Sequence, residues 1–311
     1  MLEKDVWVCW VLGALFTMPD RHPMAFKGGT SLSKVFDAIN RFSEDVDVTI
    51  DYASLDSSID PFDPTTTNNQ RQRLTENLRG LVKDHVANSV ADGLRDRLTS
   101  EFGMGSDAVA LDSGEPESVW VKYSSALDDS DEYLRDSVKL EFGGRNVITP
   151  SQPHTITPYL VEAQADITFP SATVTVLAPE RTFWEKATLI HAELGREDFR
   201  TSSDRLSRHW YDLDQLTLGP IGTAALASSE LLEEVVKIKR VFFRSGFAEY
   251  DLCTTGRLRL VPTEESVASH LGADYTEMIR AGYFDGTQPQ FEEILARLSD
   301  LEGQINKSFS S

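Results

Sequence analysis

Asp45 and Asp47 are the residues whose type and spacing most favour chemistry in this sequence. They alternate with valine and isoleucine, which predicts a strand over 44–50 with both carboxylates on one face and apolar side chains on the other. Two carboxylates on a rigid strand suit Mg²⁺, which takes one or two protein carboxylates together with substrate phosphates. The solvated face of an edge strand shows the same alternation, so the pair alone leaves both interpretations open.

A glycine-rich turn, Gly28 to Ser31, lies upstream of this strand and opens a predicted helix that carries Leu32 and Ile39. Backbone N–H groups and hydroxyls at a helix start can bind phosphate, and the helix N-terminus adds a partial positive charge. An ordinary helix start has the same composition. The turn, the helix and the Asp-x-Asp strand together favour a phosphate site beside a metal site.

The elements that must position these residues are mixed in the first part of the chain and helical in the second. A strand over 137–142 would place Glu141 on its polar face, and apolar residues recur with helical spacing from Pro179 onward. We therefore expect an α+β fold, with a mixed-sheet catalytic domain and flanking helices over 1–175 and a mainly helical domain over 176–311. The other expected elements are helices at 6–16 and 70–99, a strand at 119–124, and loops at 51–69 and 103–118.

Length and composition fit a packed globular protein. The 311 residues are compatible with two domains, and 40% of them are hydrophobic and 26% charged. Cys9 and Cys253 are too few for a disulfide framework or a Cys-rich zinc site, and they favour a reducing compartment, the cytoplasm. The longest apolar run is too short to cross a bilayer, and the acidic residues before it do not fit a secretory signal, so no membrane association is expected. That run begins only a few residues into the chain, which leaves open a further N-terminal piece.

The charge is unevenly distributed. Lys and Arg number 30 against 50 Asp and Glu, and the net charge of −20 argues against a general nucleic-acid binder. Residues 186–260 are neutral, with eleven basic and eleven acidic residues, whereas 51–135 hold 17 acidic and 8 basic residues. We therefore expect any polyanion to bind in the second half, where Lys237, Arg240 and Arg244 have the spacing of one helix face. Pairing of these cations with neighbouring glutamates is the alternative.

Two segments carry a family resemblance: Lys27-Gly28-Gly29-Thr30-Ser31-Leu32-Ser33-Lys34 and Arg41-Phe42-Ser43-Glu44-Asp45-Val46-Asp47. They resemble the signature of the AbiEii/AbiGii nucleotidyltransferase toxins, within the polymerase-beta-like superfamily. Residues 180–191 resemble the second motif of that family and 208–213 the third, and the resemblance continues to about residue 304. Fifteen residues separate Gly29 from Asp45, which is longer than in many members of the superfamily but is in keeping with this branch.

The resemblance implies nucleotidyl transfer from an NTP, with two Mg²⁺ (or Mn²⁺) ions held by three carboxylates. Asp45 and Asp47 are two of these, and Glu141 is our candidate for the third because its strand places it on the polar face. Glu162 and Asp166 compete for that role. By the same resemblance the nucleotide-binding residues are Gly28, Gly29, Thr30, Ser31, Lys34, Arg41 and Ser43.

The resemblance also assigns roles in the helical half. It implies that Lys186 supplies a cation near the triphosphate and that Asp212 is an active-site residue, which orients Lys186 or acts as a base. Without it, Lys186 would be a snorkelling helix lysine and Asp212 half of a surface ion pair with Arg208. Nearby aromatic residues and histidines are expected in the core, although a tryptophan could stack on a base: His191, His209, Trp184 and Trp210.

The expected function is that of a toxin-like nucleotidyltransferase of a toxin–antitoxin or phage-defence system. Its acceptor would be an RNA such as a tRNA 3′ end, and its partner a cognate antitoxin. Two alternatives stay open, namely phosphoryl transfer to a serine of a protein or of the chain itself, and an inactive scaffold that binds a nucleotide or a partner. The intact Asp45 and Asp47 pair argues against the scaffold. The NTP and the acceptor depend on pocket shape, which the sequence does not reveal.

Overall fold

The computed structural model describes residues 2–43, 45–125, 136–163, 167–197, 199 and 205–309. The chain divides into two compact units. Unit 1 comprises Met1–Val35 and Glu44–Leu177, and unit 2 comprises Phe36–Ser43 and Ala178–Ser311. The sequence-based boundary at 175 divides the chain only once, so it does not place Phe36–Ser43 in unit 2. The chain therefore enters unit 2 between the glycine turn and the Asp-x-Asp strand, and then returns to unit 1.

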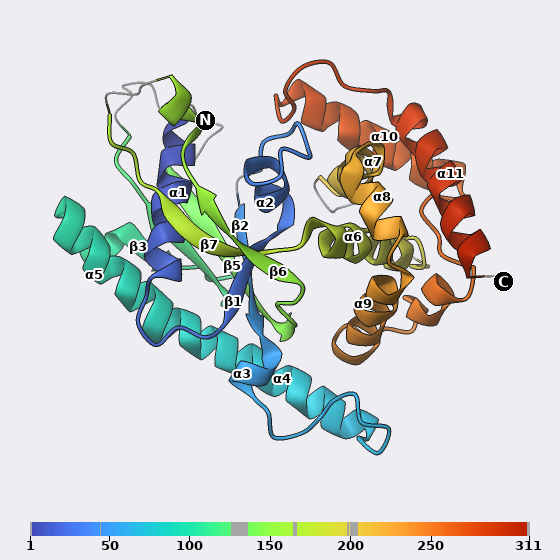
Figure 1. Cartoon of the computed structure of the whole chain (residues 1–311), viewed down its shortest axis with the longest axis horizontal. Helices are drawn as coiled ribbons and strands as arrows, with labels where there is room; N and C mark the ends of the chain where they lie inside the picture. The colour runs from blue at the N-terminus through green and yellow to red at the C-terminus, as the bar shows by residue number, and fades with distance from the viewer. Residues whose placement is uncertain are drawn as a thin grey trace. The chain divides into compact units, whose positions relative to one another are not determined.

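The described strands of unit 1 form one seven-stranded mixed sheet in the order β3-β4-β5-β2-β1-β7-β6 (Figure 1). The pairs β2–β5 and β1–β7 are parallel, and the other neighbours are antiparallel. This sheet and the helices around it confirm the predicted α+β class. The strands are β1 (Met24–Lys27), β2 (Asp45–Asp51), β3 (Val109–Leu111), β4 (Ser118–Lys122), β5 (Ser137–Asn146), β6 (Ser151–Ile156) and β7 (Ala172–Leu177).

Strand β2 has the predicted alternation, with Val46 and Val48 buried and Asp45 and Asp47 half-buried. Its apolar face is covered by helix α4, because a Cβ added at Gly144 of β5 would lie 2.4 Å from Val82 of that helix. The helical segments of unit 1 are α1 (Leu2–Phe16), α2 (Gly28–Lys34), α3 (Tyr52–Leu55), α4 (Asn68–His85), the π-turn η1 (Val86–Val90), α5 (Ala91–Phe102), η2 (Ser106–Ala108) and η3 (Tyr159–Glu162). The expected helix at 70–99 is the continuous run of α4, η1 and α5, which begins with a capping box between Thr67 and Gln70.

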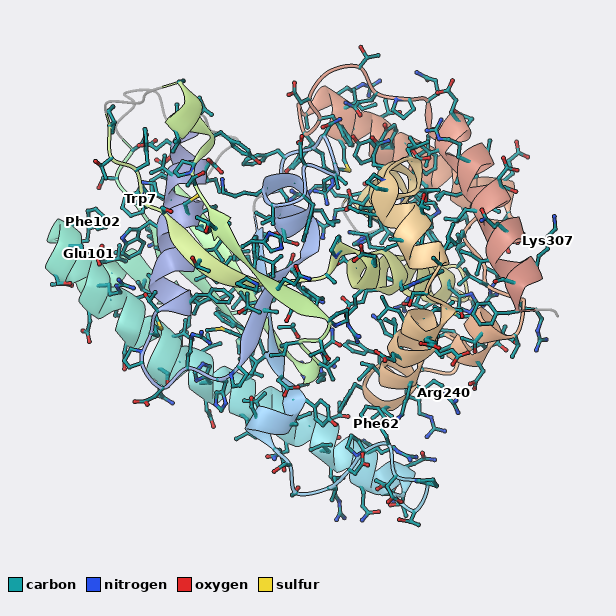
Figure 2. All side chains as sticks on the ribbon, in the orientation of Figure 1. Trp7, Phe62, Glu101, Phe102, Arg240 and Lys307 are labelled. Carbon is teal, nitrogen blue, oxygen red and sulfur yellow. The ribbon has the colours of Figure 1, made fainter. Side chains whose placement is uncertain are left out.

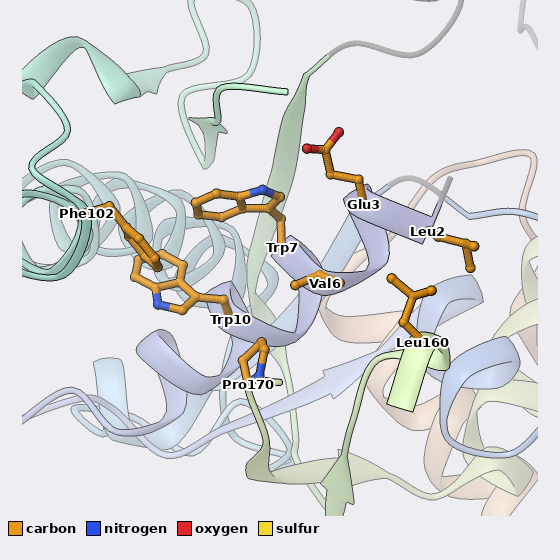
Figure 3. A pocket seen from close by; sticks show the side chains of 8 residues that line it. All are labelled: Leu2, Glu3, Val6, Trp7, Trp10, Phe102, Leu160 and Pro170. Atoms are coloured by element: carbon orange, nitrogen blue, oxygen red, sulfur yellow. The ribbon is translucent and has the colours of Figure 1, made fainter. Parts of the chain in front are cut away.

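Aromatic side chains gather at one end of unit 1, where α1 meets the end of α5. Trp7 stacks on Tyr123 with ring centroids 5.2 Å apart, and the ring centroids of Phe102 and Trp10 are 5.4 Å apart. Figure 2 shows Trp7, Glu101 and Phe102 at this end. The rings of Trp7, Trp10 and Phe102 form part of an apolar groove of about 680 Å³, which Leu2, Val6, Leu160 and Pro170 also line (Figure 3).

Several sequence-based elements need correction. The helix expected to carry Ile39 ends at Lys34, because the chain leaves unit 1 there and Ile39 is buried in unit 2. The loop expected at 51–69 contains the short helix α3, and the loop expected at 103–118 contains η2 and β3. Both regions pack on the sheet through short elements that have too few residues to show a period.

Unit 2 is helical in its described part, as predicted. Its helical segments are α6 (Pro179–Glu193), α7 (Arg208–Leu218), α8 (Pro220–Leu226), α9 (Ser229–Phe242), η4 (Tyr250–Thr254), α10 (Glu265–Arg280) and α11 (Phe291–Ser308). Helix α7 is central, since the Trp210 indole donates to the Leu260 carbonyl at 2.9 Å and Asp214 holds Arg297 of α11. The segment 36–43 joins this unit through backbone bonds from Phe42 to Tyr283 and from Asp285 to Asn40.

The predicted basic helix face is only partly present. Helix α9 carries Lys237 and Arg240 but ends at Phe242, so Arg244 lies beyond it. Arg240 projects from α9 (Figure 2) and pairs with Asp251 at 2.9 Å, with both side chains more than half exposed. The expected glutamate partners on the helix itself are therefore replaced, for Arg240, by an aspartate from η4.

Candidate active site

The carboxylates of Asp45, Asp47 and Glu141 lie on one face of two adjacent strands in unit 1. In the parallel register of β2 and β5, Asp47 pairs with Glu141 and Asp45 with Lys139. The side chains between them, Val46 and Leu140, point to the opposite face and are fully buried. Strand pairing therefore brings together the three residues that the sequence proposed as metal ligands, although Glu141 lies 94 positions after Asp47 in the chain.

The negative charge of this carboxylate face is partly offset by Lys139. The Lys139 ammonium lies 2.5 Å from Glu141 Oε1 and 2.5 Å from Glu115 Oε2. Burial raises the pKa of Glu141, and the charges of Asp47 and Asp45 raise it further, against the opposing hydrogen bond from Lys139. The same bonds raise the pKa of Lys139 despite its burial. The face thus concentrates negative charge that a cation would relieve.

Gly28 lies directly against Asp47. Its φ is +82°, and an added Cβ would fall 2.0 Å from Asp47 Oδ2. The glycine at this position is therefore required by the close approach of the turn to the carboxylate. The hydroxyl of Thr30 donates to the Asp45 carbonyl and that of Ser31 to the Gly28 carbonyl, so the turn is fixed to the start of β2.

Two other residues expected to bind the nucleotide, Lys34 and Ser43, have surroundings that differ from those of the glycine turn. The Lys34 ammonium pairs with Asp5 of α1 and lies 4.2 Å from the centroid of the Tyr159 ring. Its side chain is 3% exposed, so its charge is directed into unit 1. Ser43 is half-buried in the 36–43 segment of unit 2. The competing carboxylate Asp166 and the side chain of Glu162 lie outside the described residues, as does Arg200.

Within unit 2, Arg41, Lys186 and Asp212 form a buried charged cluster. Arg41 donates from Nε to Asp212 Oδ1 at 2.6 Å and from Nη2 to Oδ2 at 2.7 Å, and Lys186 Nζ donates to Oδ2 at 2.7 Å. Asp212 is fully buried, which excludes the surface ion pair with Arg208. Burial alone would raise the pKa of Asp212, but Arg41 and Lys186 outweigh it and hold this pKa below its usual range. Burial lowers the pKa of Lys186, and Asp212 opposes that shift.

The aromatic and histidine residues near this cluster are core residues, as expected. Trp184 and Trp210 are 1% and 0% exposed. His191 accepts a hydrogen bond from the Arg259 backbone N–H at 3.0 Å, and burial lowers its pKa to about 4. Burial, followed by the Lys186 charge, also holds the pKa of His209 well below 6.5. Both imidazoles are therefore neutral at pH 7.

The carboxylate face fits a divalent cation through its donor set. Asp45 and Asp47 supply hard oxygen ligands beside a turn without a Cβ, in keeping with the one or two protein carboxylates that Mg²⁺ takes. Among the described residues, no three His, Cys, Asp or Glu side chains surround a common point as metal ligands. Glu141 is held by Lys139, so a cation that recruits Glu141 must compete with this ammonium for its oxygens.

Sequence reasoning missed two partnerships. The sequence did contain a signal for the pairing of Lys139 with Glu141, because the alternation of β5 places these two residues on the same face. No local sequence signal indicated the bond between Arg41 and Asp212, since the two residues are 171 positions apart in the chain.

The Asp-x-Asp strand against a glycine turn offers the hard oxygen ligands and the tight turn that a metal-dependent nucleotide-processing protein uses. The AbiEii family profile, described as nucleotidyl transferase toxins of type IV toxin–antitoxin systems, matches residues 10–297. The chain belongs to this family, which makes it a nucleotidyltransferase toxin with a cognate antitoxin. Among solved structures, it is similar to MenT4, a nucleotidyltransferase toxin from Mycobacterium tuberculosis H37Rv, with 15% identity, a TM-score of 0.43, and coverage of 99% of this chain and 93% of that chain. A search of curated proteins finds no match. In the described part of the chain, no helix is long and apolar enough to cross a membrane.

Proposed function

We propose that this toxin transfers a nucleotide from an NTP to an RNA acceptor, such as a tRNA 3′ end, in a reaction that depends on Mg²⁺ or Mn²⁺. The observation that carries the proposal is the position of Asp45 and Asp47 beside Gly28, with Glu141 in register on the next strand. A hydroxyl oxygen of the RNA would attack the α-phosphorus, the bond to the β-phosphate would break, and pyrophosphate would leave.

Asp45 and Asp47 would hold the metal, and Glu141 would join them as a third ligand. Bound Mg²⁺ would stabilise the charge on the attacking and leaving oxygens. The Gly28 to Ser31 turn would present backbone N–H groups to the phosphates, and the bond from the Thr30 hydroxyl to the Asp45 carbonyl holds the turn against β2. Rigid placement of the ligands favours the transition state because less reorganisation is needed during the reaction.

Lys186, Asp212 and Arg41 are proposed to act as one charged group. Two cations on one buried carboxylate leave an excess of positive charge, which suits the binding of a triphosphate. Asp212 would orient Lys186, in agreement with the 2.7 Å bond between them. We further propose a cytoplasmic site of action, which agrees with the free thiols of Cys9 and Cys253, and a contribution to phage defence.

The test is incubation of the purified protein with total RNA, Mg²⁺ and each NTP labelled at the α- or γ-phosphate. Transfer of α-label to RNA is expected, and it should fall at least about 100-fold in Asp45→Asn or Asp47→Asn. The fold of these variants should persist, because Asp45 and Asp47 are only half-buried and asparagine has nearly the same size as aspartate. Label from the γ-phosphate in protein would instead identify a kinase-like reaction, and the absence of any transfer would identify a scaffold.

A further inference from the structure

Lys139 is placed within the carboxylate face rather than at its edge. Residues 139 and 141 lie on the same face of β5, opposite Asp45 and Asp47 of β2. The four charged side chains thus form two cross-strand pairs, of which one joins opposite charges and the other joins like charges. The like pair, Asp47 and Glu141, is the one that strand geometry makes unfavourable without a cation.

The ammonium of Lys139 is fixed by three neighbours. It lies 2.5 Å from Glu141 Oε1, 2.5 Å from Glu115 Oε2 and 5.7 Å from the centroid of the Trp120 ring. Trp120 is itself held, because its indole donates to Asp112 Oδ2 at 2.7 Å. The Lys139 side chain is only 12% exposed, so the surrounding protein confines its charge.

A divalent cation and this ammonium require the same oxygens of Glu141. Glu115 gives Lys139 a second partner, so Lys139 stays paired when Glu141 turns away from it. The exchange therefore replaces one cation by another at Glu141 and leaves no buried ammonium without a carboxylate. We propose that Lys139 is an internal counter-ion that competes with the metal for Glu141 and thereby sets how tightly the face holds a divalent cation. Lys139 is a positioning residue, and the inference rests on the proposed function.

The experiment measures Mn²⁺ binding by electron paramagnetic resonance of free Mn²⁺, without NTP or RNA, at fixed ionic strength. Lys139→Met should tighten Mn²⁺ binding on the order of tenfold, because it removes a nearby positive charge and the ion pair that occupies Glu141. Lys139→Arg, which keeps the charge, should leave affinity close to that of the wild type. Lys122→Met is the matched control, since Lys122 of β4 is exposed further along the same face of the sheet, and it should change affinity by less than about twofold.

A double-mutant cycle tests the competition itself. Glu141→Gln should weaken Mn²⁺ binding more in the Lys139→Met background than in the wild type, because only there can Glu141 bind the ion unopposed. Equal effects in both backgrounds, or unchanged or weaker binding in Lys139→Met, would overturn the inference.

A surface variant keeps the test independent of how Lys139→Met folds. Glu115→Gln removes the second carboxylate that holds Lys139, so it should weaken Mn²⁺ binding more than Glu117→Gln, and equal effects would count against the inference. Asp47→Asn separates the two proposals. If Asp47→Asn leaves Mn²⁺ binding intact, the metal face of the proposed function is wrong. If it removes binding while the Lys139 variants have no effect, only the role of Lys139 fails.

Discussion

At the residue scale, Gly28 is the position where adding one methyl group would displace a proposed metal ligand, Asp47. A Cβ there would overlap Asp47 Oδ2, and the φ of +82° strains any other residue. We expect Gly28→Ala to reduce nucleotide transfer by about 10- to 100-fold, because the Asp47 carboxylate must move away from its proposed ligand position. Activity with labelled NTP and Mn²⁺ affinity are the two measurements.

The matched control for Gly28→Ala is Gly103→Ala. Gly103 also has a positive φ, +65°, but an added Cβ meets nothing within 4 Å. This variant carries the backbone strain without the clash, so it should cost stability of about 1 kcal/mol and leave the specific activity unchanged. Equal loss of activity in both variants would show that strain, rather than the displacement of Asp47, is responsible.

Arg41 and Asp212 allow a second prediction at this scale. Arg41→Met leaves fully buried Asp212 with Lys186 as its remaining ionic partner within the cluster and removes two short hydrogen bonds. We expect a loss of about 3 kcal/mol in the free energy of unfolding, measured in urea, because Oδ1 of the buried Asp212 carboxylate loses its hydrogen bond from Arg41 and Oδ2 loses one of its two.

Arg240→Met provides the comparison for Arg41→Met, since the Arg240–Asp251 pair is 58% and 66% exposed. Its cost should stay within about 1 kcal/mol. Equal costs in the two variants would contradict the buried character of the Arg41 cluster.

The sequence predicts those parts of the candidate site that depend on a local pattern of residues within one strand. Alternation indicates the common face of Asp45 and Asp47, and that of Lys139 and Glu141, because a strand period needs only neighbouring residues. The environment of Lys34 could not be predicted from the sequence. The motif places it beside the nucleotide-binding turn, whereas its ammonium pairs with Asp5 of a helix that no local signal connects to it.

At the element scale, the contact between α4 and β5 has a built-in test in two adjacent glycines. A Cβ at Gly144 would lie 2.4 Å from Val82 Cγ2 and 2.5 Å from Leu55 Cδ1, whereas one at Gly143 meets nothing within 4 Å. Gly144→Ala should therefore destabilise the protein by about 1–3 kcal/mol through overpacking, and Gly143→Ala should not. Thermal unfolding of both variants checks this, and similar shifts would mean that the helix adjusts without cost.

Sequence reasoning missed strand β6 and the end of helix α2 for two different physical reasons. Strand β6 is an edge strand with one buried residue, Ile156, and a proline, Pro153, so it has no apolar period to detect. Helix α2 ends at Lys34 although apolar residues continue to Ile39, because those residues are buried in unit 2. Elements with one buried face, such as β2 and α4, are the ones that a local pattern determines.

At the scale of the whole molecule, charge decides where a polyanion can bind. With a net charge of −20, the protein repels RNA except where cations gather, and residues 186–260 are the neutral stretch. Lys237, Arg240 and Arg244 lie there, at and just beyond the C-terminal end of α9. The ion pair of Arg240 with Asp251 is exposed, so a phosphate can replace the aspartate at little cost.

If RNA is the acceptor, alanine at Lys237, Arg240 and Arg244 together should weaken RNA binding and flatten its salt dependence. The slope of log K against log salt should fall by about 0.7 for each phosphate that the variant no longer neutralises, because fewer counterions are released. Alanine at the exposed Arg73 and Lys83 of α4, in the acidic stretch, is the control and should leave the slope unchanged. Mn²⁺ binding should be the same in all variants, since it depends on the carboxylate face. An unchanged slope in the triple variant would exclude the end of α9 as the RNA-binding surface. These cations would then serve only in ion pairs with acidic residues, as Arg240 does with Asp251.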